Sequence, residues 1–496
     1  MQVFWFKRDL RINDNEPLVE ALKLGPVLPL YVFEPTLWLQ PDLSYRHYLF
    51  LKDSINDLNK ELSQLGQQLI IKVGPILKIF DDLHQRHKLT TIWGHHETWN
   101  LWTKNRNLQV ENWAKINKIK LRFIQQNGIV KNLKNRNRWA TAWYSTMNKT
   151  IYKRPTRMDK INESSQLIPS AKDLNILNDG FKPFLKGGRK TGLKLLYTFL
   201  DFRSEFYSKN MSSPNTASNS CSKLSSYVSF GCISIKEIFQ ESMKKKNELN
   251  NSTSSSKSWV NSIRSFLQRL RWHCHFIQKL EDDCNIENFN LHSSYNLIRN
   301  EKINTYFLNS WKTGNTGYPF IDACMRYLIT NGWINFRMRA MLISFSSHHL
   351  WLHWKAPSIH LARLFTDYEP GIHYSQIQMQ SGTTGINKIR IYNPLKQSKD
   401  NDPDGIFIKK WVPELKSVPT NHIHEPWSYI SSVKYPRPII NEKLARDTAL
   451  KKIYEIKKNN NFYREARIIR TKHSNSSNIT HKKKYSNTLQ KSIDFK

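Results

Sequence analysis

A run of small and hydroxyl-bearing residues could hold a phosphorylated ligand. The run is Cys221-Ser222-Lys223-Leu224-Ser225, and it leads into a predicted helix. Backbone N–H groups at the start of a helix, together with hydroxyl and ammonium donors, bind phosphate oxygens. Taken alone, an ordinary helix cap is the commoner interpretation of such a run.

Charged residues in two later segments could form an ion pair beside a ligand. Arg337 and Arg339 lie two apart on a predicted helix, so they project in different directions. One can face a buried partner while the other faces a phosphate. Asp367 and Glu369 follow in a predicted loop and could pair with Arg339. Taken alone, a surface ion pair is the commoner interpretation of these residues.

Residues that could ligate a metal are present but poorly spaced. His273, Cys274 and His275 are followed by Cys284, yet residues two apart on a helix point in nearly opposite directions. The five cysteines are scattered, and no group of four lies near the C-terminus to hold an iron–sulfur cluster. We therefore expect no metal site, and reduced thiols in a cytoplasmic protein.

The first part of the chain alternates apolar runs with helical patterns. This βα rhythm predicts an α/β N-terminal domain at residues 1–130, with a five-stranded, Rossmann-like parallel sheet covered on both faces. The predicted strands are residues 3–6, 27–33, 69–73, 90–93 and 121–124. Ligands in such folds bind beyond the carboxyl ends of the strands. Residues 94–98 lie there, and either a second chromophore or an ordinary loop would explain them.

The remainder of the chain has a different organisation. Residues 131–186 show no steady period and are predicted to be a connector, whereas residues 187–456 are predicted to be an all-α domain. A polar stretch at residues 247–257 is typical of a flexible loop. Residues 457–496 are rich in Lys, Asn and Ser, and we expect a basic, disordered tail there.

The overall charge favours a polyanionic partner. Lys and Arg number 76 against 40 Asp and Glu, which gives a net charge of +36. Nucleic acid is the leading partner on this basis, although a solvated basic surface or compositional bias would give the same balance. No apolar run is long enough to span a membrane, and the N-terminus lacks the pattern of a signal peptide.

Five motifs in the same order resemble the photolyase/cryptochrome family, over roughly residues 1–440. They are residues 4–11 (FWFKRDLR), 221–225 (CSKLS), 316–328 (TGYPFIDACMRYL), 390–394 (RIYNP) and 411–415 (WVPEL). The resemblance implies that FAD binds in the helical C-terminal domain. In the repair members, reduced flavin excited by blue light passes an electron to a flipped-out pyrimidine dimer, which splits and returns the electron.

The resemblance also implies roles for individual residues. Arg339 and Asp367 match a salt-bridged pair beside the flavin ring, and Glu369 matches the acidic position at the ring's pyrimidine edge. The full set of implied cofactor-binding residues is Tyr207, Cys221, Ser222, Lys223, Leu224, Ser225, Arg339, Asp367, Tyr368, Glu369 and His373. The implied DNA-binding residues are Arg269, Trp272, Arg337, Met379 and Arg390, and the implied catalytic residues are Trp272, His373 and Trp354.

Several positions depart from the family's pattern near the flavin. His373 stands where photolyases usually have Asn, and a His there could change charge near neutral pH and retune the flavin. Ile377 stands at the innermost Trp of the family's electron relay and cannot carry an electron. Trp354 matches the middle relay position. Light-driven flavin reduction should therefore be slow or use another path.

Other departures lie on the substrate side. Arg269 replaces the carboxylate that repair members use to hold the dimer, and Met379 replaces the substrate-side Trp. Phe336 replaces the usual Asn, and the paired His residues of (6-4) photolyases are missing. By resemblance, most of the residues implied to bind FAD match the family's pattern, whereas several residues implied to line the lesion pocket differ from it.

Three functions are therefore compared. The first is a monomeric, light-dependent photolyase of UV-damaged DNA, splitting cyclobutane dimers or a related lesion; the net charge and Arg337 favour it. The second is a cryptochrome-like blue-light photoreceptor that binds FAD without repair, which Arg269 and Ile377 favour. The third, a basic nucleic-acid-binding protein that has lost its flavin, conflicts with Arg339 and Asp367. A second antenna chromophore, of the folate or deazaflavin type, is left open.

Overall fold

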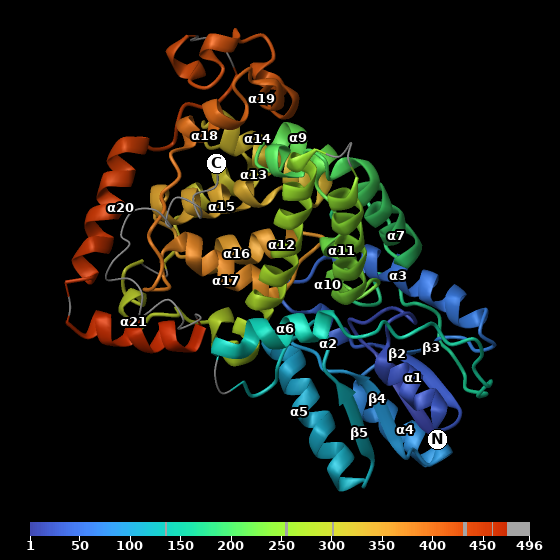
Figure 1. The fold of residues 1–496 in the computed structure, drawn as a ribbon. Coiled ribbons are helices and arrows are strands. Elements are labelled where there is room, and N and C mark those ends of the chain that lie inside the picture. The colour runs from blue at the N-terminus through green and yellow to red at the C-terminus, as the bar shows by residue number, and fades with distance from the viewer. Residues whose placement is uncertain (134–135, 253–255, 300–301, 430–433, 459, 474–496) are drawn as a thin grey trace.

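A computed structural model describes residues 1–133, 136–252, 256–299, 302–429, 434–458 and 460–473. It consists of an α/β half, built from the N-terminus, and a larger helical half (Figure 1). Within the described ranges, no helix is long and apolar enough to cross a membrane.

The predicted parallel sheet is confirmed. Its five strands run in the order β3-β2-β1-β4-β5, and every neighbouring pair is parallel. The central strand β1 pairs with β2 on one side and with β4 on the other. The chain adds β2 and β3 on one side of β1 and then crosses to add β4 and β5 on the other side, so the topological switch point lies between β1 and β4. The strands are β1 (Gln2–Phe6), β2 (Val27–Phe33), β3 (Ile70–Val73), β4 (Thr91–His95) and β5 (Lys120–Ile124).

The two faces of this sheet have different neighbours. Val3 and Trp5 of β1 pack with α4 (Ile76–His87) and α5 (Leu101–Ile116) in one apolar core. Phe4 and Phe6 point to the opposite face, because successive strand residues alternate. That face belongs to the core that continues into the helical half. The other helices of this half are α1 (Glu16–Lys23), α2 (Pro35–Trp38) and α3 (Tyr45–Ser63).

The segment predicted as an irregular connector contains a helix. The 3-10 turn η1 (Arg136–Arg138) leads into α6 (Trp139–Met147), whose residues Trp139, Trp143 and Met147 are buried. These three lie four residues apart, which is the spacing of one helix face. The stretch between α6 and α7 then runs without helix or strand over the α/β half.

The helical half begins at α7 and confirms the predicted all-α character. Gly332 ends α14 with a positive φ of 69°. The helices are α7 (Arg189–Thr198), η2 (Phe199–Arg203), α8 (Tyr207–Asn210), α9 (Pro214–Ser220), α10 (Ser225–Ser229), α11 (Ile235–Asn251), α12 (Lys257–Asp282), η3 (Cys284–Glu287), η4 (Ser293–Tyr295), α13 (Thr305–Thr313), α14 (Pro319–Asn331), α15 (Phe336–Ser344), η5 (Phe345–His349), α16 (Lys355–Leu364), α17 (Pro370–Ser381), α18 (Pro394–Asn401), α19 (Ile406–Trp411), η6 (Pro413–Leu415), η7 (Thr420–His422), η8 (Pro426–Ser428), α20 (Glu442–Ile456) and α21 (Asn460–His473).

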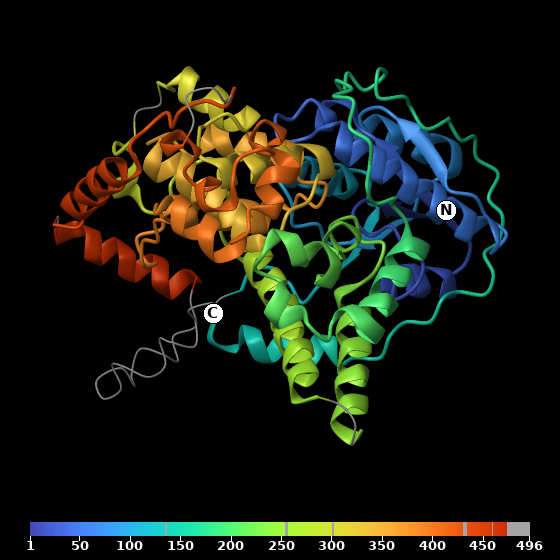
Figure 2. The ribbon, with the colours of Figure 1, turned by 90° about the horizontal axis from the view of Figure 1, so that it is seen from above.

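Two predicted flexible segments are more ordered than expected. Helix α11 extends to Asn251, so little of the polar stretch at residues 247–257 is left between α11 and α12, which form a projecting hairpin in Figure 2. The predicted tail begins with α21, whose Phe462 ring stacks on His292 at 4.2 Å between ring centroids. This buried contact explains the helix despite its basic composition. Residues 474–496 lie outside the described residues.

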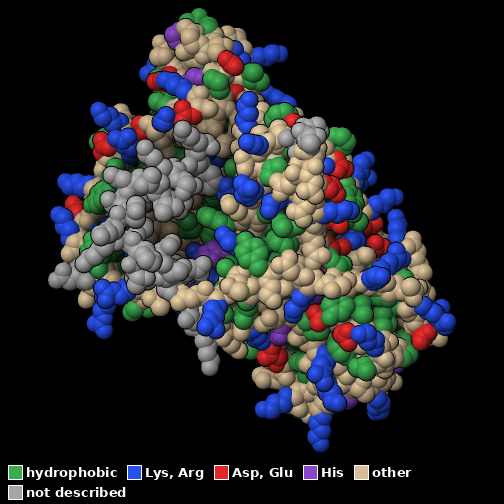
Figure 3. Space-filling view, in the orientation of Figure 1, with side chains coloured by type: hydrophobic (Ala, Val, Ile, Leu, Met, Phe, Trp, Pro, Cys, Tyr) green, Lys and Arg blue, Asp and Glu red, His purple; other side chains and the backbone are tan. Residues whose placement is uncertain are grey.

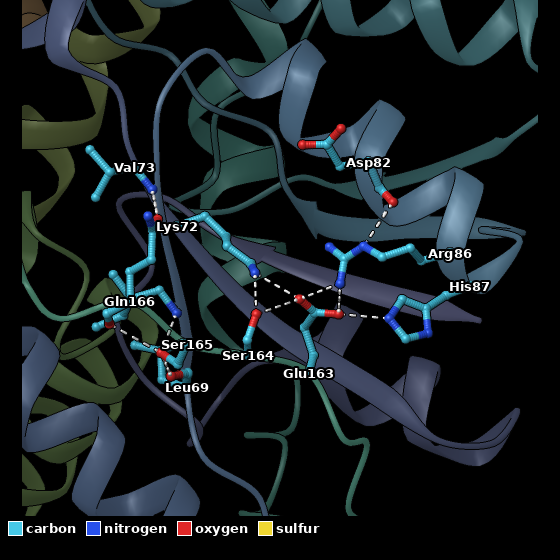
Figure 4. A network of polar contacts seen from close by, with 11 residues as sticks. Leu69, Lys72, Val73, Asp82, Arg86, His87, Glu163, Ser164, Ser165 and Gln166 are labelled. Carbon is cyan, nitrogen blue, oxygen red and sulfur yellow. Dashed lines mark hydrogen bonds and ion pairs between the residues drawn. The ribbon is translucent and has the colours of Figure 1, made fainter.

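A buried carboxylate fastens the connector to the edge of the sheet (Figure 4). Glu163 pairs with Lys72 of β3 at 2.7 Å, with Arg86 at 2.6 Å and with His87 at 2.7 Å. Burial alone would raise the pKa of Glu163, but hydrogen bonds from Arg86, Lys72 and His87 lower it to about 2. Since Gln166 also bonds to the backbone of β3, the connector covers the outer strand.

We predict that Glu163→Gln lowers thermal stability near neutral pH, by roughly 1–3 kcal/mol, because Lys72 and Arg86 lose their buried counter-charge. A carboxyl whose pKa is depressed on folding stabilises the protein above its unfolded pKa. The difference between wild type and variant should therefore shrink as the pH falls from about 4.5 towards 2. Melting curves measured against pH check this. Glu111→Gln, which removes the exposed Lys131–Glu111 pair, is the matched control, and equal losses in both variants would contradict the prediction.

Candidate functional site

Three helices pack closely at the centre of the helical half. Helix α17 lies against both α12 and α15. Gly371, in the first turn of α17, permits the approach to α12, because a Cβ there would lie 2.6 Å from the Cα of Ile277. Any larger residue at 371 would force these helices apart. Of the predicted site residues, Arg269 and Trp272 lie on α12, Arg337 and Arg339 on α15, and His373 and Met379 on α17, with residues 367–369 directly before α17. Tyr207, residues 221–225 and Arg390 come from other segments.

The predicted ion pair forms just ahead of α17. Arg339 of α15 donates from Nη1 to Oδ1 of Asp367 at 3.0 Å and from Nη2 to Oδ2 at 2.9 Å. Its Nε donates to the Ile334 carbonyl at 2.7 Å, and the guanidinium lies over the Phe365 ring. Each of the three guanidinium nitrogens thereby makes a hydrogen bond. The Asp367 side chain is almost fully buried, so the pair presents a rigid polar edge.

The 221–225 run lies among several cations. Burial raises the pKa of the Cys221 thiol to about 12, and the charges that oppose this rise come from Lys223, Arg203, Arg339 and Arg269. Arg203 also donates to the Cys221 carbonyl. These residues come from four separate parts of the helical half. The structure thus gathers positive charge around the run, as binding of a diphosphate requires.

Tyr207 joins the same cluster. Its side chain is buried against Phe199 and Phe266 and is hydrogen-bonded to Arg269. The predicted phosphate-binding residues and the predicted ring-side pair are therefore neighbours, linked through Arg269 and Arg339. Sequence reasoning missed Arg203, because nothing in the residues around it indicates a ligand.

His373 is neutral in this site. Its side chain is buried, and its Nε2 lies 2.9 Å from the Ser358 carbonyl. Burial lowers the pKa of His373 to about 3. This pKa contradicts the expectation that His373 could change charge near neutral pH, because desolvation outweighs the opposing charge of Asp367. Since a carbonyl can only accept, Nε2 carries the proton and Nδ1 keeps a lone pair.

Buried polar atoms without hydrogen-bond partners among the described residues indicate that a ligand completes the site. Asn335 Oδ1, Glu369 Oε1 and Ser375 Oγ are such atoms. Buried polar groups are normally satisfied. Burial raises the pKa of Glu369 to about 7, although the charge of Arg8 opposes this. The cationic cluster, the fixed ion pair and these atoms together fit a phosphorylated, ring-bearing cofactor.

The predicted substrate-side residues are more exposed to solvent than Asp367, Glu369 and His373 are. Trp272 on α12 is 40% exposed, and the Arg269 guanidinium lies 5.9 Å from its ring. Arg337 and Met379 are partly buried, whereas Arg390 is exposed. Arg269 therefore has contacts on both sides, with Tyr207 inside and Trp272 at the surface. Figure 3 shows Lys and Arg side chains distributed over the face of the molecule drawn there.

Trp354, the predicted relay residue, is buried at the start of α16. Its Nε1 donates to Asn290 at 2.7 Å, and its ring lies 6.3 Å from that of Tyr374. Ile377 is also buried. Sequence reasoning missed Tyr374, which adjoins His373 in the chain.

Two clefts open at the carboxyl edge of the sheet, where the fold predicts a ligand. The larger, of about 140 Å³, lies between the predicted segment 94–98 and the helical half; the smaller is about 50 Å³. Lys7 lines both clefts, and its Nζ has no hydrogen-bond partner among the described residues. Glu369 lines the larger cleft, so it connects the flank of α17 with this edge.

Comparison with known proteins agrees with this geometry. The family described as DNA photolyase matches residues 2–156, and the one described as the FAD binding domain of DNA photolyase matches residues 266–455. The chain is 28% identical to a deoxyribodipyrimidine photo-lyase of Buchnera aphidicola, over 90% of this chain and 95% of that one. It is 24% identical to a cryptochrome DASH of Gloeobacter violaceus, over 88% and 92%.

Solved structures give the same fold. An archaeal photolyase from Sulfolobus tokodaii superposes with a TM-score of 0.77 at 25% identity, covering 92% of this chain and 99% of that one. A Synechocystis cryptochrome gives 0.81 at 21% identity, covering 91% and 98%. The sheet order, the helical half and both family matches lead to one conclusion: the chain belongs to the photolyase/cryptochrome family and carries its FAD-binding domain.

Proposed function

We propose that this protein is a light-dependent DNA photolyase that uses FAD to split UV-induced pyrimidine dimers. The observation that carries the proposal is the exposed Trp272 with Arg269 beside it, directly outside the cationic cluster. An exposed aromatic ring next to a cation suits an extruded base and its phosphate. The deoxyribodipyrimidine photo-lyases among the relatives support the same reaction.

Different residues would hold the cofactor and the DNA. Arg339 and Asp367 would fix the flavin ring, while the 221–225 run would hold the phosphates together with Arg203. Arg337 and Arg390 would contact the phosphates of DNA, and the net charge of +36 would strengthen that attraction. Reduced flavin, when bound and excited, supplies the electron that splits the dimer. The side chains contribute binding, orientation and exclusion of water.

A cryptochrome-like photoreceptor without repair is the second candidate. Two observations favour it: Arg269 brings positive charge where repair members have a carboxylate, and Ile377 interrupts the relay. Arg269 is nevertheless held by Tyr207 and Trp272, which supports a built contact for the substrate.

The clefts at the sheet edge could hold a second chromophore. The Sulfolobus tokodaii photolyase was crystallised with two FAD molecules, which implicate a novel light-harvesting cofactor in that protein. In this chain, Lys7 and Glu369 supply buried polar atoms to the larger cleft. A planar molecule of the folate or deazaflavin type would satisfy them, because its anionic groups would accept from Lys7 and its N–H groups would donate to Glu369.

Repair of a dimer-containing oligonucleotide tests the proposed function. The FAD-reduced protein is incubated with the oligonucleotide under blue light and in darkness, and intact pyrimidines are quantified. Restoration only in the light establishes a photolyase. FAD-loaded protein that gives no repair in the light would favour the photoreceptor.

We predict that Trp272→Ala weakens binding of the dimer-containing strand by about 1–3 kcal/mol, the range for losing one stacked base. Affinity for undamaged duplex should change little, since phosphate contacts dominate it. Fluorescence anisotropy with both oligonucleotides checks this. Tyr306→Ala removes another exposed aromatic ring and should leave both affinities unchanged. Equal weakening for damaged and undamaged DNA would contradict the stacking role.

We predict that Asp367→Asn lowers FAD affinity at least about tenfold, because it leaves the Arg339 charge uncompensated at the ring edge. The FAD-to-protein ratio and a flavin titration measure the loss. Glu414→Gln breaks a comparable two-bond pair with Arg326 on the far side of α14 and serves as the control. Full FAD occupancy in Asp367→Asn would show that the ring lies elsewhere.

A further inference from the structure

A largely buried group of basic side chains lies where α21 meets α12 and the turn before α6. Arg136 comes from η1, His275 and Lys279 from α12, and His473 from the last turn of α21. Residues 275 and 279 are about one helical turn apart, so they share a face of α12. Helix α21 packs against η1, and Figure 1 shows its end beside the start of α6. We call these four residues the α21 cluster.

Direct contacts hold the α21 cluster together. The Arg136 guanidinium donates from Nη2 to the His275 carbonyl at 3.4 Å and lies 5.5 Å from the centroid of the Trp139 ring. The centroids of the Trp139 and His275 rings are 5.7 Å apart. Burial lowers the pKa of His275. Lys279, Arg136 and His473 lower it further, so the four groups lie within electrostatic reach of one another.

The α21 cluster carries more positive charge than the nearby carboxylates balance. Asp282 lies 3.5 Å from Nε of Arg136, and Asp283 pairs with Lys472 at 2.9 Å. Among the described residues, no carboxylate forms an ion pair with Lys279. Burial and the charge of Arg136 lower the pKa of Lys279 to about 8, so this ammonium is still mostly charged at neutral pH. One partly buried cation therefore lacks a counter-ion in the part of the chain that the structure describes.

Several buried nitrogen atoms of this region have no hydrogen-bond partner among the described residues. They are Nη1 of Arg136, Nε1 of Trp139 and both ring nitrogens of His473. Arg136 is 4% exposed, and Trp139 and His473 are each 2% exposed, so solvent scarcely reaches them. A buried polar atom without a partner is costly. Unpartnered donors beside an unbalanced cation are the groups that an oxyanion satisfies.

The two ring nitrogens of His473 narrow the choice of anion. Burial lowers the pKa of His473 to about 3, so at neutral pH one nitrogen donates and the other can only accept. Sulfate and chloride carry no proton for the accepting nitrogen. Inorganic phosphate keeps a proton at neutral pH, so it can donate to His473 while it accepts from Arg136 and Trp139. The backbone of a nucleic acid binds in an open groove instead, whereas these side chains are buried.

We propose that Arg136, Lys279 and His473 form a binding site for free inorganic phosphate beneath α21, separate from the flavin and DNA sites. The anion balances the charge of Lys279 and accepts from the unpartnered donors. Helix α21 lies beyond residue 455, where the match to the FAD binding domain ends. Bound phosphate therefore fastens a segment outside that domain to the helical half, because it offsets repulsion between Lys472 of α21 and the cations beneath it.

Isothermal titration calorimetry of the FAD-loaded protein with inorganic phosphate tests the proposal, since bound FAD already occupies the proposed cofactor site. Wild type should bind phosphate saturably and at least about tenfold more tightly than sulfate, which leaves a His473 nitrogen unpaired. Lys279→Gln should weaken phosphate binding at least about tenfold, the scale of one hydrogen bond to a charged group. Arg264→Gln is the matched control, because it removes an exposed cation from the same helix. The control should keep the wild-type affinity.

Two further measurements keep the test decisive if Lys279→Gln misfolds. Phosphate should slow amide hydrogen exchange of α21 in the wild type, whereas sodium chloride at equal ionic strength should not. His473→Phe should lose the preference for phosphate over sulfate, because it removes the accepting nitrogen. The proposal is overturned if FAD-loaded wild type does not bind phosphate saturably, or if folded Lys279→Gln binds it as tightly as wild type. Displacement of the phosphate by an undamaged oligonucleotide would also overturn it, since the anion would then lie on the open DNA surface.

Discussion

The site depends on one ion pair, in which Asp367 is buried and Arg339 is partly buried. Arg339 and Asp367 are held by two parallel hydrogen bonds, and a third bond fixes Nε of Arg339. Burying the Asp367 charge is costly, and it is tolerated here because Arg339 donates to both carboxylate oxygens. The pair therefore admits one arrangement of α15 relative to the loop before α17. Tyr368, Glu369 and His373 follow Asp367 directly, so their positions depend on that arrangement.

The α/β half contributes to the same site through its shared core. One sheet face is continuous with the helical core, and the start of α3 bonds to the end of α16, as in the Ser44 hydroxyl bond to the Arg363 carbonyl at 2.7 Å. Asp42 lies beside this junction and reaches Tyr368. Asp42 thus accepts the Tyr368 hydroxyl from 326 positions away in the chain. The same packing places the carboxyl edge of the sheet next to Glu369.

Sequence patterns predicted most of the fold. The strands were predictable because their apolar runs are short and bounded by helical patterns, and Asp367 was predictable as a partner of Arg339 because both stand in motifs. Helix α6 and helix α21 were missed, since a basic or irregular composition concealed apolar residues four apart. Arg203 and Asp42 could not be predicted, because only tertiary packing brings them to the site. The neutrality of His373 likewise depends on its burial.

The proposed function places the flavin ring against Arg339 and Asp367, with its phosphates at residues 221–225. The structure of the protein crystallised with FAD tests this placement most directly. We expect density for the isoalloxazine ring at the Arg339–Asp367 edge, with His373 on its flank and the diphosphate among Arg203, Lys223 and Arg269. Density for FAD only in the clefts at the sheet edge, with the cationic cluster filled by side chains or water, would contradict it.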